Sequence, residues 1–302
     1  MCCFAQDVDS VKNTKIFTRL TDKGTQLLAY AMSYESDVPN AMILPVPTTG
    51  REDSLRFIDM SDYEDLFRDL QRGFPALRSV LSTALPASAN TAVDSPLLKV
   101  HTVGSFVASF VPTVDDFDRL DPQFVIPKET WAQVSGYEGY GYAVFQLDEN
   151  AGKTHPMAME FETTLKEKVF FPTLHIHDGQ VHEREAFDHY LFAQHAGFDS
   201  VVGAYDGPKR EDASTGMVRS KSAAGEFVKA EKTSGLIDPN LLLHRKRLRG
   251  MLRNEDTLFK ATGHPTKVTF NARPLFRWWP IGLAAMGLAW IVGRRAKLLS
   301  RK

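Results

Sequence analysis

The fold is decided by short apolar runs near the N-terminus, and the clearest of them is Gln26-Leu-Leu-Ala-Tyr-Ala-Met-Ser33. The turn signal Asp22-Lys23-Gly24 comes before this run, and a second run, Ala41-Met-Ile-Leu-Pro45, comes after it. Short apolar runs between turn residues are typical of β-strands. Pro45 closes the second run, because proline cannot donate a hydrogen bond to a central strand ladder. This part of the chain is therefore predicted to form a sheet.

Further strands are predicted downstream, with only a few helices between them. The best helix signal is Ser61-Asp-Tyr-Glu64, a capping box followed by an apolar stripe that stops at Gly73. The expected fold class is α+β, a mainly antiparallel sheet with a few helices, plus one C-terminal membrane helix. Runs rich in β-branched and aromatic residues predict the later strands at 97–103, 105–112, 140–147, 157–163 and 169–177.

Charge is distributed unevenly over the 302 residues, although the net charge is only −1. Residues 1–204 carry 16 Lys and Arg against 29 Asp and Glu, whereas residues 261–302 carry eight basic residues and no acidic one. Affinity for phosphate needs Lys and Arg, so the acidic part is not expected to bind nucleic acid. A hydrophobic content of 43% excludes a wholly disordered chain, and two adjacent cysteines exclude a disulfide framework.

These shifts in composition divide the chain into four predicted parts. They are an acidic β-rich globular domain at 1–204, a polar linker or loop at 205–237, a basic helix and short strand at 238–274, and a transmembrane helix with a basic tail at 275–302.

The basic segment 241–253 is predicted to be helical, because Leu241, Leu248 and Leu252 fall along one side of a helix with arginines around them. Two interpretations are open. The helix is either a solvated surface helix or an interfacial helix that lies on anionic lipid.

The transmembrane prediction rests on an uncharged stretch of 16 residues, Trp278 to Gly293. Tryptophans at both ends match the aromatic belts of membrane helices, and small residues recur at helix–helix spacing. A span needs about 17–25 residues, so Leu298 and Leu299 extend the stretch if the arginines before them snorkel. The lipid bilayer is therefore an expected partner. A buried C-terminal helix of the globular core is the alternative.

We expect a single-pass C-terminal membrane anchor, with the side of the membrane left open. Five basic residues after the anchor, against two shortly before it, favour a cytoplasmic C-terminus. The N-terminus shows neither the basic nor the apolar region of an export signal. The main domain is then either cytoplasmic and tail-anchored, or the true start codon lies upstream.

Five of the nine histidines fall between positions 175 and 195, around the dipeptide Asp178-Gly179. Asp-Gly between alternating runs predicts a two-residue β-hairpin. In that register His175 lies opposite His182, with Cβ atoms about 5 Å apart, and His177 shares their face. Three imidazoles would then converge on one side of the ribbon.

Three convergent imidazoles suit zinc or another divalent metal with an open fourth position, where bound water would become a nucleophile. The predicted metal ligands are His175, His177 and His182. Candidates for the fourth ligand or for an outer hydrogen-bonding role are Glu183, Asp188 and His189. The alternatives are histidines that face solvent or serve structural hydrogen bonds, and metal-free acid–base chemistry.

Cys2 is a weak candidate for a catalytic nucleophile. Removal of Met1 would place its thiol beside a free α-amino group, the arrangement of N-terminal-nucleophile hydrolases. Cys2 and Cys3 are also candidates for redox thiols, acylated thiols or metal ligands, and unreactive reduced cysteines are the simplest interpretation.

The first 75 residues resemble an uncharacterised bacterial domain family. The resemblance rests on Cys2-Cys3, on the strand from Leu27 to Tyr34, on Asn40-Ala-Met-Ile-Leu-Pro-Val-Pro47 and on Leu66-Phe-Arg-Asp-Leu70. Members of that family often carry an export signal and a C-terminal helix with trailing arginines. The tail of this chain is similar, whereas the export signal is missing. The resemblance implies no activity and no catalytic residue.

Three classes of function are compatible with these patterns. The first is a membrane-anchored bacterial protein that holds a divalent metal in the histidine hairpin. The second is a hydrolase that uses this metal or the Cys2 thiol. The third is a non-catalytic structural or protein-interaction module, whose protein partners the residues do not identify.

Membrane fractionation of the full-length chain and of a variant without residues 275–302 tests the anchor. We expect the full-length chain in the membrane fraction, because the uncharged stretch is apolar on every side, and the truncated chain in the soluble fraction. Recovery of the full-length chain wholly in the soluble fraction would refute the anchor.

Overall fold

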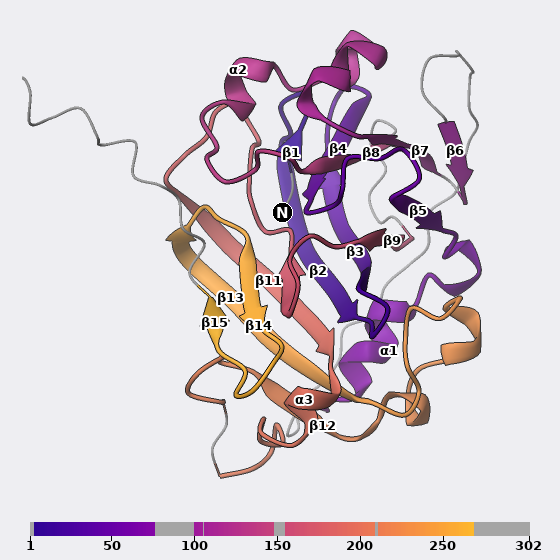
Figure 1. Cartoon of the computed structure of the whole chain (residues 1–302), viewed down its shortest axis with the longest axis vertical. Coiled ribbons are helices and arrows are strands. Elements are labelled where there is room, and N and C mark those ends of the chain that lie inside the picture. The colour runs from indigo at the N-terminus through magenta and orange to yellow at the C-terminus, as the bar shows by residue number, and fades with distance from the viewer. Residues whose placement is uncertain (1–2, 76–99, 105, 148–154, 209–210, 269–302) are drawn as a thin grey trace, which may run out of the picture. The chain divides into compact units, whose positions relative to one another are not determined.

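The computed structural model describes residues 3–75, 100–104, 106–147, 155–208 and 211–268. Most of this chain lies in two larger sheets, a smaller third sheet and short helices (Figure 1). The pairing is antiparallel except between β11 and β2, which run parallel. The mainly antiparallel sheet with few helices agrees with the predicted α+β class.

The seven-stranded sheet has the order β12-β13-β11-β2-β3-β9-β5. Its longest strands form the centre, because β2 and β3 pair along almost their whole length and β11 adds beside β2. The bounds are β2 Ser10–Leu20, β3 Thr25–Glu35, β5 Leu55–Ile58, β9 Met157–Glu162, β11 Arg184–Gln194, β12 Val218–Ala223 and β13 Leu242–Arg253.

The other two sheets are smaller. The five-stranded sheet has the order β1-β4-β8-β7-β6, and the three-stranded sheet has the order β10-β14-β15. Their bounds are β1 Cys3–Phe4, β4 Asn40–Val46, β6 Val100–Val103, β7 Phe106–Val111, β8 Gly141–Leu147, β10 Lys168–Phe171, β14 Thr257–Lys260 and β15 Lys267–Val268.

The α-helices are short, and 3-10 turns make up the remaining helical structure. The predicted capping box forms the 3-10 turn Ser61–Tyr63, and the α-helix starts only afterwards, at Leu66. The helices are α1 Leu66–Arg72, α2 Lys128–Trp131 and α3 Ala196–Asp199, and the other 3-10 turns are Val114–Arg119, Pro122–Phe124, Ala224–Glu226 and Ala230–Lys232.

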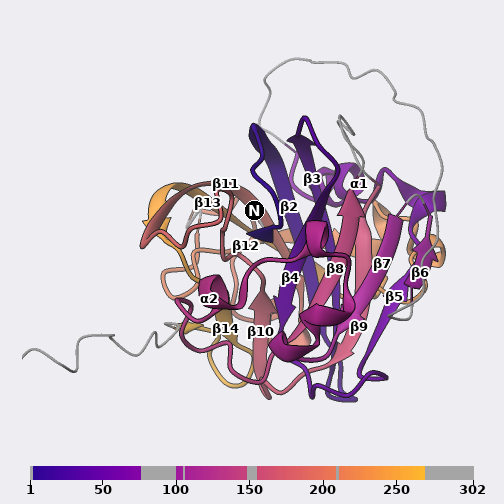
Figure 2. The same ribbon diagram turned by 90° about the horizontal axis from the view of Figure 1, so that it is seen from above.

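The seven-stranded sheet is buried on both faces along much of its length, since adjacent residues of β2 belong to different cores. Ile16 packs into the larger core, which it shares with the five-stranded sheet. Phe17 packs into a second core, where Phe67 of α1 lies against Phe192 of β11 with ring centroids 6.2 Å apart. Two packed layers of this kind explain why β3 is buried over most of its length, whereas the more polar β2 is buried mainly around Ile16 and Phe17 (Figure 2).

The predicted basic helix at 241–253 is wrong, because residues 242–253 form β13. The strand pairs with β11 over ten consecutive residue pairs, from Arg184 opposite Arg253 to Ala193 opposite His244. Alternation of exposed Arg247 and Arg249 with buried Leu248 fits a strand as well as a helix. Ten ladder pairs decide in favour of the strand, since they satisfy the backbone groups that face β11.

The segment predicted as a polar linker, 205–237, is part of the folded body. It contains β12 and contributes Val228, Leu236 and Ile237 to the second core. Its low content of aromatic residues concealed these few apolar anchors. The predicted transmembrane helix at 275–302 lies outside the described residues and stays a prediction. Among the helices in the described ranges, none is long and apolar enough to span a bilayer.

Candidate functional site

The predicted hairpin at Asp178-Gly179 is not formed as a β-ribbon. Gly179 has a positive φ of 71°, as a turn requires, but residues 172–183 contain only an isolated bridge at Ile176. The strands on either side, β10 and β11, belong to different sheets. The expected register between His175 and His182 is therefore wrong.

A side chain replaces the missing ladder. The backbone N–H of His175 donates to Oδ1 of Asn254 at 2.7 Å. The amide of Asn254 donates in turn to the carbonyls of His175 and His182, at 2.9 and 3.0 Å. One asparagine just after β13 thus holds the loop, and the histidine side chains need not share one face.

The structure brings together His175, His177 and His189, and it leaves out His182. The ring of His175 lies between the other two, with centroids 5.3 Å from His177 and 5.2 Å from His189. Its Nε2 is 3.3 Å from Nε2 of His189 on β11. The exposed His182 instead contacts Asp178, with 2.9 Å between Nε2 and Oδ2, and this hydrogen bond raises the pKa of His182.

Burial keeps the clustered imidazoles neutral at physiological pH. It lowers the pKa of His175 well below the usual value of an imidazole, and it also lowers the pKa of His189. The pKa of His177 falls to about 4. Neutral imidazole is the metal-binding form. The described part of the chain nevertheless contains no group of three His, Cys, Asp or Glu that could hold a metal ion.

Two of the predicted supporting carboxylates also lie elsewhere. Asp188 is exposed on β11 and pairs with Arg247, 2.8 Å away. Glu183 is exposed, and its backbone carbonyl accepts from the N–H of Asn254. Of the three candidates, only His189 joins the cluster. His189 lies on the inward face of β11, and the sequence around it does not show that this face is buried.

A buried carboxylate that the sequence did not single out lies nearby. Asp256 accepts hydrogen bonds from the hydroxyl of Tyr137 and from the backbone N–H groups of Thr173 and Leu174, at 2.7–2.9 Å. Burial raises its pKa from 3.8 to about 6. The signal was the polar turn Asn254-Glu-Asp256 between the basic strand β13 and β14, but its role depends on a loop about 80 residues away.

The thiol of Cys3 is buried in β1 and points toward the carbonyl of Leu174, 3.9 Å from the sulfur. Strand β1 runs beside Ile176, with the N–H of Phe4 donating to the carbonyl of Ile176. Cys2, the predicted nucleophile, lies outside the described residues and stays a prediction.

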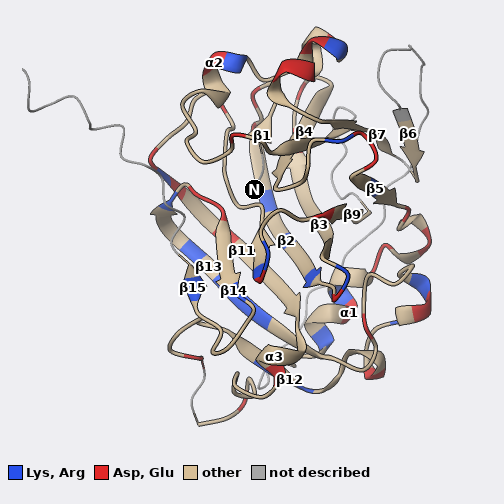
Figure 3. Ribbon diagram, in the orientation of Figure 1, with Lys and Arg blue, Asp and Glu red and all other residues tan. Residues whose placement is uncertain are grey.

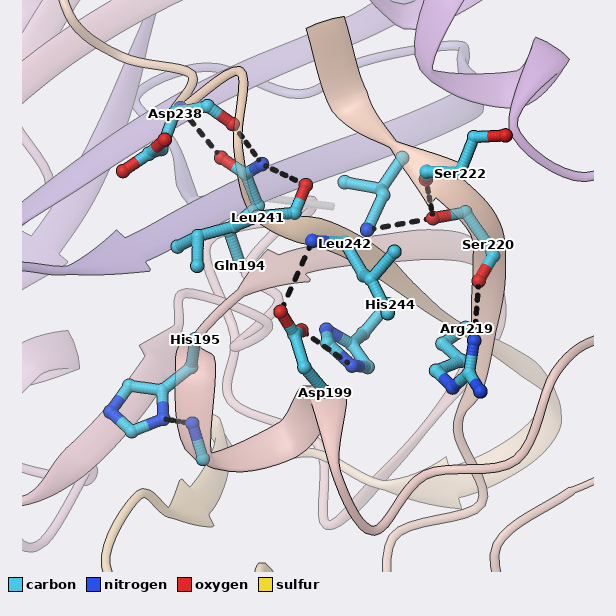
Figure 4. Close-up of polar contacts among 12 residues, drawn as sticks. Gln194, His195, Asp199, Arg219, Ser220, Ser222, Asp238, Leu241, Leu242 and His244 are labelled. Atoms are coloured by element: carbon cyan, nitrogen blue, oxygen red, sulfur yellow. Dashed lines mark hydrogen bonds and ion pairs between the residues drawn. The ribbon is translucent and has the colours of Figure 1, made fainter. Parts of the chain in front are cut away.

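A contact between the half-buried Asp199 of α3 and the buried His244 lies where β13 begins (Figure 4). Oδ1 of Asp199 is 3.4 Å from Nε2 of His244, a ring with no exposed surface. Burial lowers the pKa of His244 to about 3, so the ring is neutral. The hydroxyl of Ser220 donates to the carbonyl of Ser222 and accepts from the N–H of Leu243. Among the described residues no hydroxyl is hydrogen-bonded to the imidazole of His244, so the contact is not a Ser-His-Asp site. Asp199 also accepts from the N–H of Leu242, and it thereby links α3 to the start of β13.

Exposed arginines form a row on one face of the β11–β13 pair, and Figure 3 marks the Lys and Arg positions of β13 in blue. We call Arg184, Arg247, Arg249 and Arg253 the basic ladder. Residues opposite one another in a ladder share a face, so Arg184 stands beside Arg253, and Asp188 beside Arg249. Met251, which is 56% exposed, lies within the row.

The basic ladder is only partly neutralised. Arg247 pairs with Asp188 and lies 5.2 Å above the ring of Tyr190, and Arg253 is 3.9 Å from Glu255. Arg249 forms no ion pair with any described residue. Like charges placed directly opposite each other, such as Arg184 and Arg253, destabilise a sheet. The arrangement is thus one that folding alone does not favour.

A small cavity of about 250 Å³ lies beneath the basic ladder, on the inner face of the same strands. Its apolar walls are Phe187 of β11 and Leu248 and Leu252 of β13. The rest of the lining is polar or charged and comes from Arg184, Arg253, Glu255, Thr257 and Lys267.

No model of a known protein family matches the chain. Among solved structures, the chain is similar to baculovirus P35, with 13% identity and a TM-score of 0.43 over 86% of this chain and 97% of the other. It is similar to P35 in the caspase-8/P35 complex, with 12% identity and a TM-score of 0.43 over 85% and 97%. A mutated baculovirus P35 after caspase cleavage gives 13% and 0.41, over 85% and 100%.

Of the three predicted zinc ligands, only His175 and His177 lie in the cluster. Metal analysis of the purified full-length chain tests whether zinc binds there. If the site exists, zinc is stoichiometric in the wild type, is lost in His175→Ala/His177→Ala, and is kept in His182→Ala, whose ring lies outside the cluster. A folded wild type that carries no zinc after purification in zinc-containing buffer would refute it.

Asp256 should make the protein less stable as pH rises from about 4 to 6. Its raised pKa means that folding favours the protonated acid, so ionisation in the folded state costs roughly 2–3 kcal/mol, a cost absent below pH 3.8. Asp256→Asn removes this pH-dependent loss, because an amide does not titrate and still accepts from both N–H groups.

The measurement is urea unfolding at pH 4, 5, 6 and 7 of the wild type, Asp256→Asn and the exposed control Asp62→Asn. The wild-type and Asp256→Asn free energies of unfolding should diverge with rising pH, whereas the control should follow the wild type. Parallel curves for wild type and Asp256→Asn would contradict the assignment.

Proposed function

We propose that this chain is a protein-binding module whose basic ladder receives an acidic surface of a partner protein. The observation that carries the proposal is the set of four exposed, incompletely paired arginines on one sheet face, in a chain whose first 204 residues have a large acidic excess. A local basic face on an acidic body both attracts and orients an acidic partner.

The composition of the face suits a protein partner. Arginine, methionine and tyrosine are enriched in the central parts of protein interfaces, and Met251 and Tyr190 accompany the arginines here. Arg247 is already oriented by its contacts with Tyr190 and Asp188, so less of its rotamer freedom is lost on binding.

A long polyanion fits this surface less well. Nucleic acids and anionic bilayers extend far beyond one patch of four arginines and would also meet the acidic excess of residues 1–204. A compact acidic segment of a protein meets only the patch, because interactions beyond about 8–10 Å are screened at physiological salt.

The buried histidines and Asp256 point into the protein and not toward the basic ladder, which supports binding rather than catalysis at the ladder. His175, His189, His244 and Asp256 are buried with at most 1% exposure, and each contacts protein groups. Caspase-8, the partner named for P35 in one compared structure, belongs in a panel of purified proteins to be tested, but the proposal rests on the basic ladder alone.

Binding of a fluorescein-labelled decaglutamate peptide, followed by anisotropy, tests the proposal. Arg249→Glu should weaken binding about three- to tenfold at 50 mM salt, since it reverses one exposed charge within the patch. Higher salt should weaken wild-type binding.

The matched control is Lys23→Glu, which makes the same charge change at the exposed β2–β3 turn, at the other end of the sheet. It should bind like the wild type. Equal losses in both variants, or tighter binding of a single-stranded oligonucleotide or phosphatidylserine vesicles than of the peptide, would overturn the proposal.

A further inference from the structure

Strand β13 has an open edge along its second half. It pairs with β11 up to Arg253, but its pairing with β12 on the other side reaches only Arg245. In the ranges that the structure describes, no strand lies beside Arg247–Arg253 on the side away from β11. Apart from the β11 ladder, the only hydrogen bond that a residue in these ranges makes to the backbone of Arg247–Leu252 runs from the Arg184 guanidinium to the Met251 carbonyl, at 2.5 Å.

An open edge of seven residues is long enough to accept another strand. Natural proteins usually block such edges with proline, bulges, covering loops or charged side chains, because unpaired N–H and C=O groups template further pairing. Here the stretch contains no proline, and the charges are all positive. These charges repel an identical edge from a second copy, but they attract an acidic strand.

The cavity beneath β13 adds a second recognition element. Alternate residues of a strand point to opposite faces, so a strand added beside β13 presents one set of side chains to the basic ladder and the other set to the inner face. On that inner face Leu248, Leu252 and Phe187 line the cavity of about 250 Å³. It offers room for one apolar side chain of the added strand.

We infer that the open edge Arg247–Arg253 binds an extended acidic peptide by strand addition, with an apolar side chain in the cavity and carboxylates on the basic ladder. This inference rests on the proposed function and specifies how the acidic partner binds. Main-chain hydrogen bonds supply affinity in this mode, and alternate side chains supply specificity.

Charge complementarity selects the occupant. The chain's own residues 269–302 carry seven basic residues and no acidic one, so they are repelled by the basic ladder. A second copy of β13 is repelled for the same reason. An acidic strand from a partner protein is the occupant that both the ladder and the cavity favour.

Backbone methylation separates strand addition from charge attraction. The probe is a labelled peptide of five Glu-Val repeats, measured by anisotropy against the full-length chain. It is compared with the same peptide N-methylated at alternate amides, which keeps every side chain but loses the hydrogen bonds to the edge. Because several hydrogen bonds to the strand edge are lost together, methylation of alternate amides should weaken binding at least about tenfold.

Two further measurements use the same peptide. Hydrogen exchange of the β13 amides is followed with and without it, and its salt-dependent binding is measured for Leu248→Ala, which enlarges the cavity without changing the charge. We expect added protection within Arg247–Arg253 and no loss of the salt dependence in Leu248→Ala. Equal affinity of the methylated and unmethylated peptides, or no added protection, overturns strand addition and leaves the proposed function standing. Failure of Arg249→Glu to weaken either peptide overturns both.

Discussion

The pairing of β11 with β13 is the interaction on which the rest of this structure depends. Ten consecutive residue pairs join two segments that are about 60 residues apart in the chain. One face of the pair carries the basic ladder into solvent. The other carries Phe187, His189 and Leu248 inward, where they meet the imidazole cluster and the cavity. Both surfaces exist only because the two strands share one register.

The turn after β13 extends the influence of this pairing. Asn254 holds the loop that contains His175 and His182, and Asp256 holds the backbone at Thr173 and Leu174. Side chains that replace a strand ladder satisfy buried backbone groups while leaving the loop irregular. The loop therefore presents His175 to the interior and His182 to solvent. Burial then makes the interior rings neutral, which suits packing against Phe187 more than it suits proton transfer at neutral pH.

The distribution of charge favours one surface of the molecule, the basic ladder, as the binding site for an acidic partner. Buried ionisable groups such as His175 and Asp256 contact other residues of the same chain. The arginines of the basic ladder instead remain exposed beside an open strand edge. A sheet normally avoids like charges opposite one another and long open edges. Both occur together on the same strand here, next to a cavity with apolar walls. Their coincidence is what favours a bound acidic strand over a purely structural interpretation.

The sequence by itself determined the fold class and several strands, because apolar runs between turn residues report local structure directly. The runs at 26–33 and 41–45 lie in β3 and β4, and the region 157–163 contains β9. It could not determine which faces of these strands are buried, and so it did not find Asp256 or the Asp199–His244 contact. It assigned a helix to 241–253 and a hairpin to 178–179, because spacing within a short segment is compatible with more than one structure.

Only the tertiary structure decided those segments. The ladder with β11 made 242–253 a strand, and hydrogen bonds from Asn254 to the carbonyls of His175 and His182 took the place of the predicted hairpin ladder. The resemblance to a bacterial domain family stays a prediction, as do the anchor at 275–302 and the Cys2 nucleophile. Long-range pairing overrides local preference because the free energy of many ladder bonds and buried side chains is larger than the small differences in propensity between helix and strand.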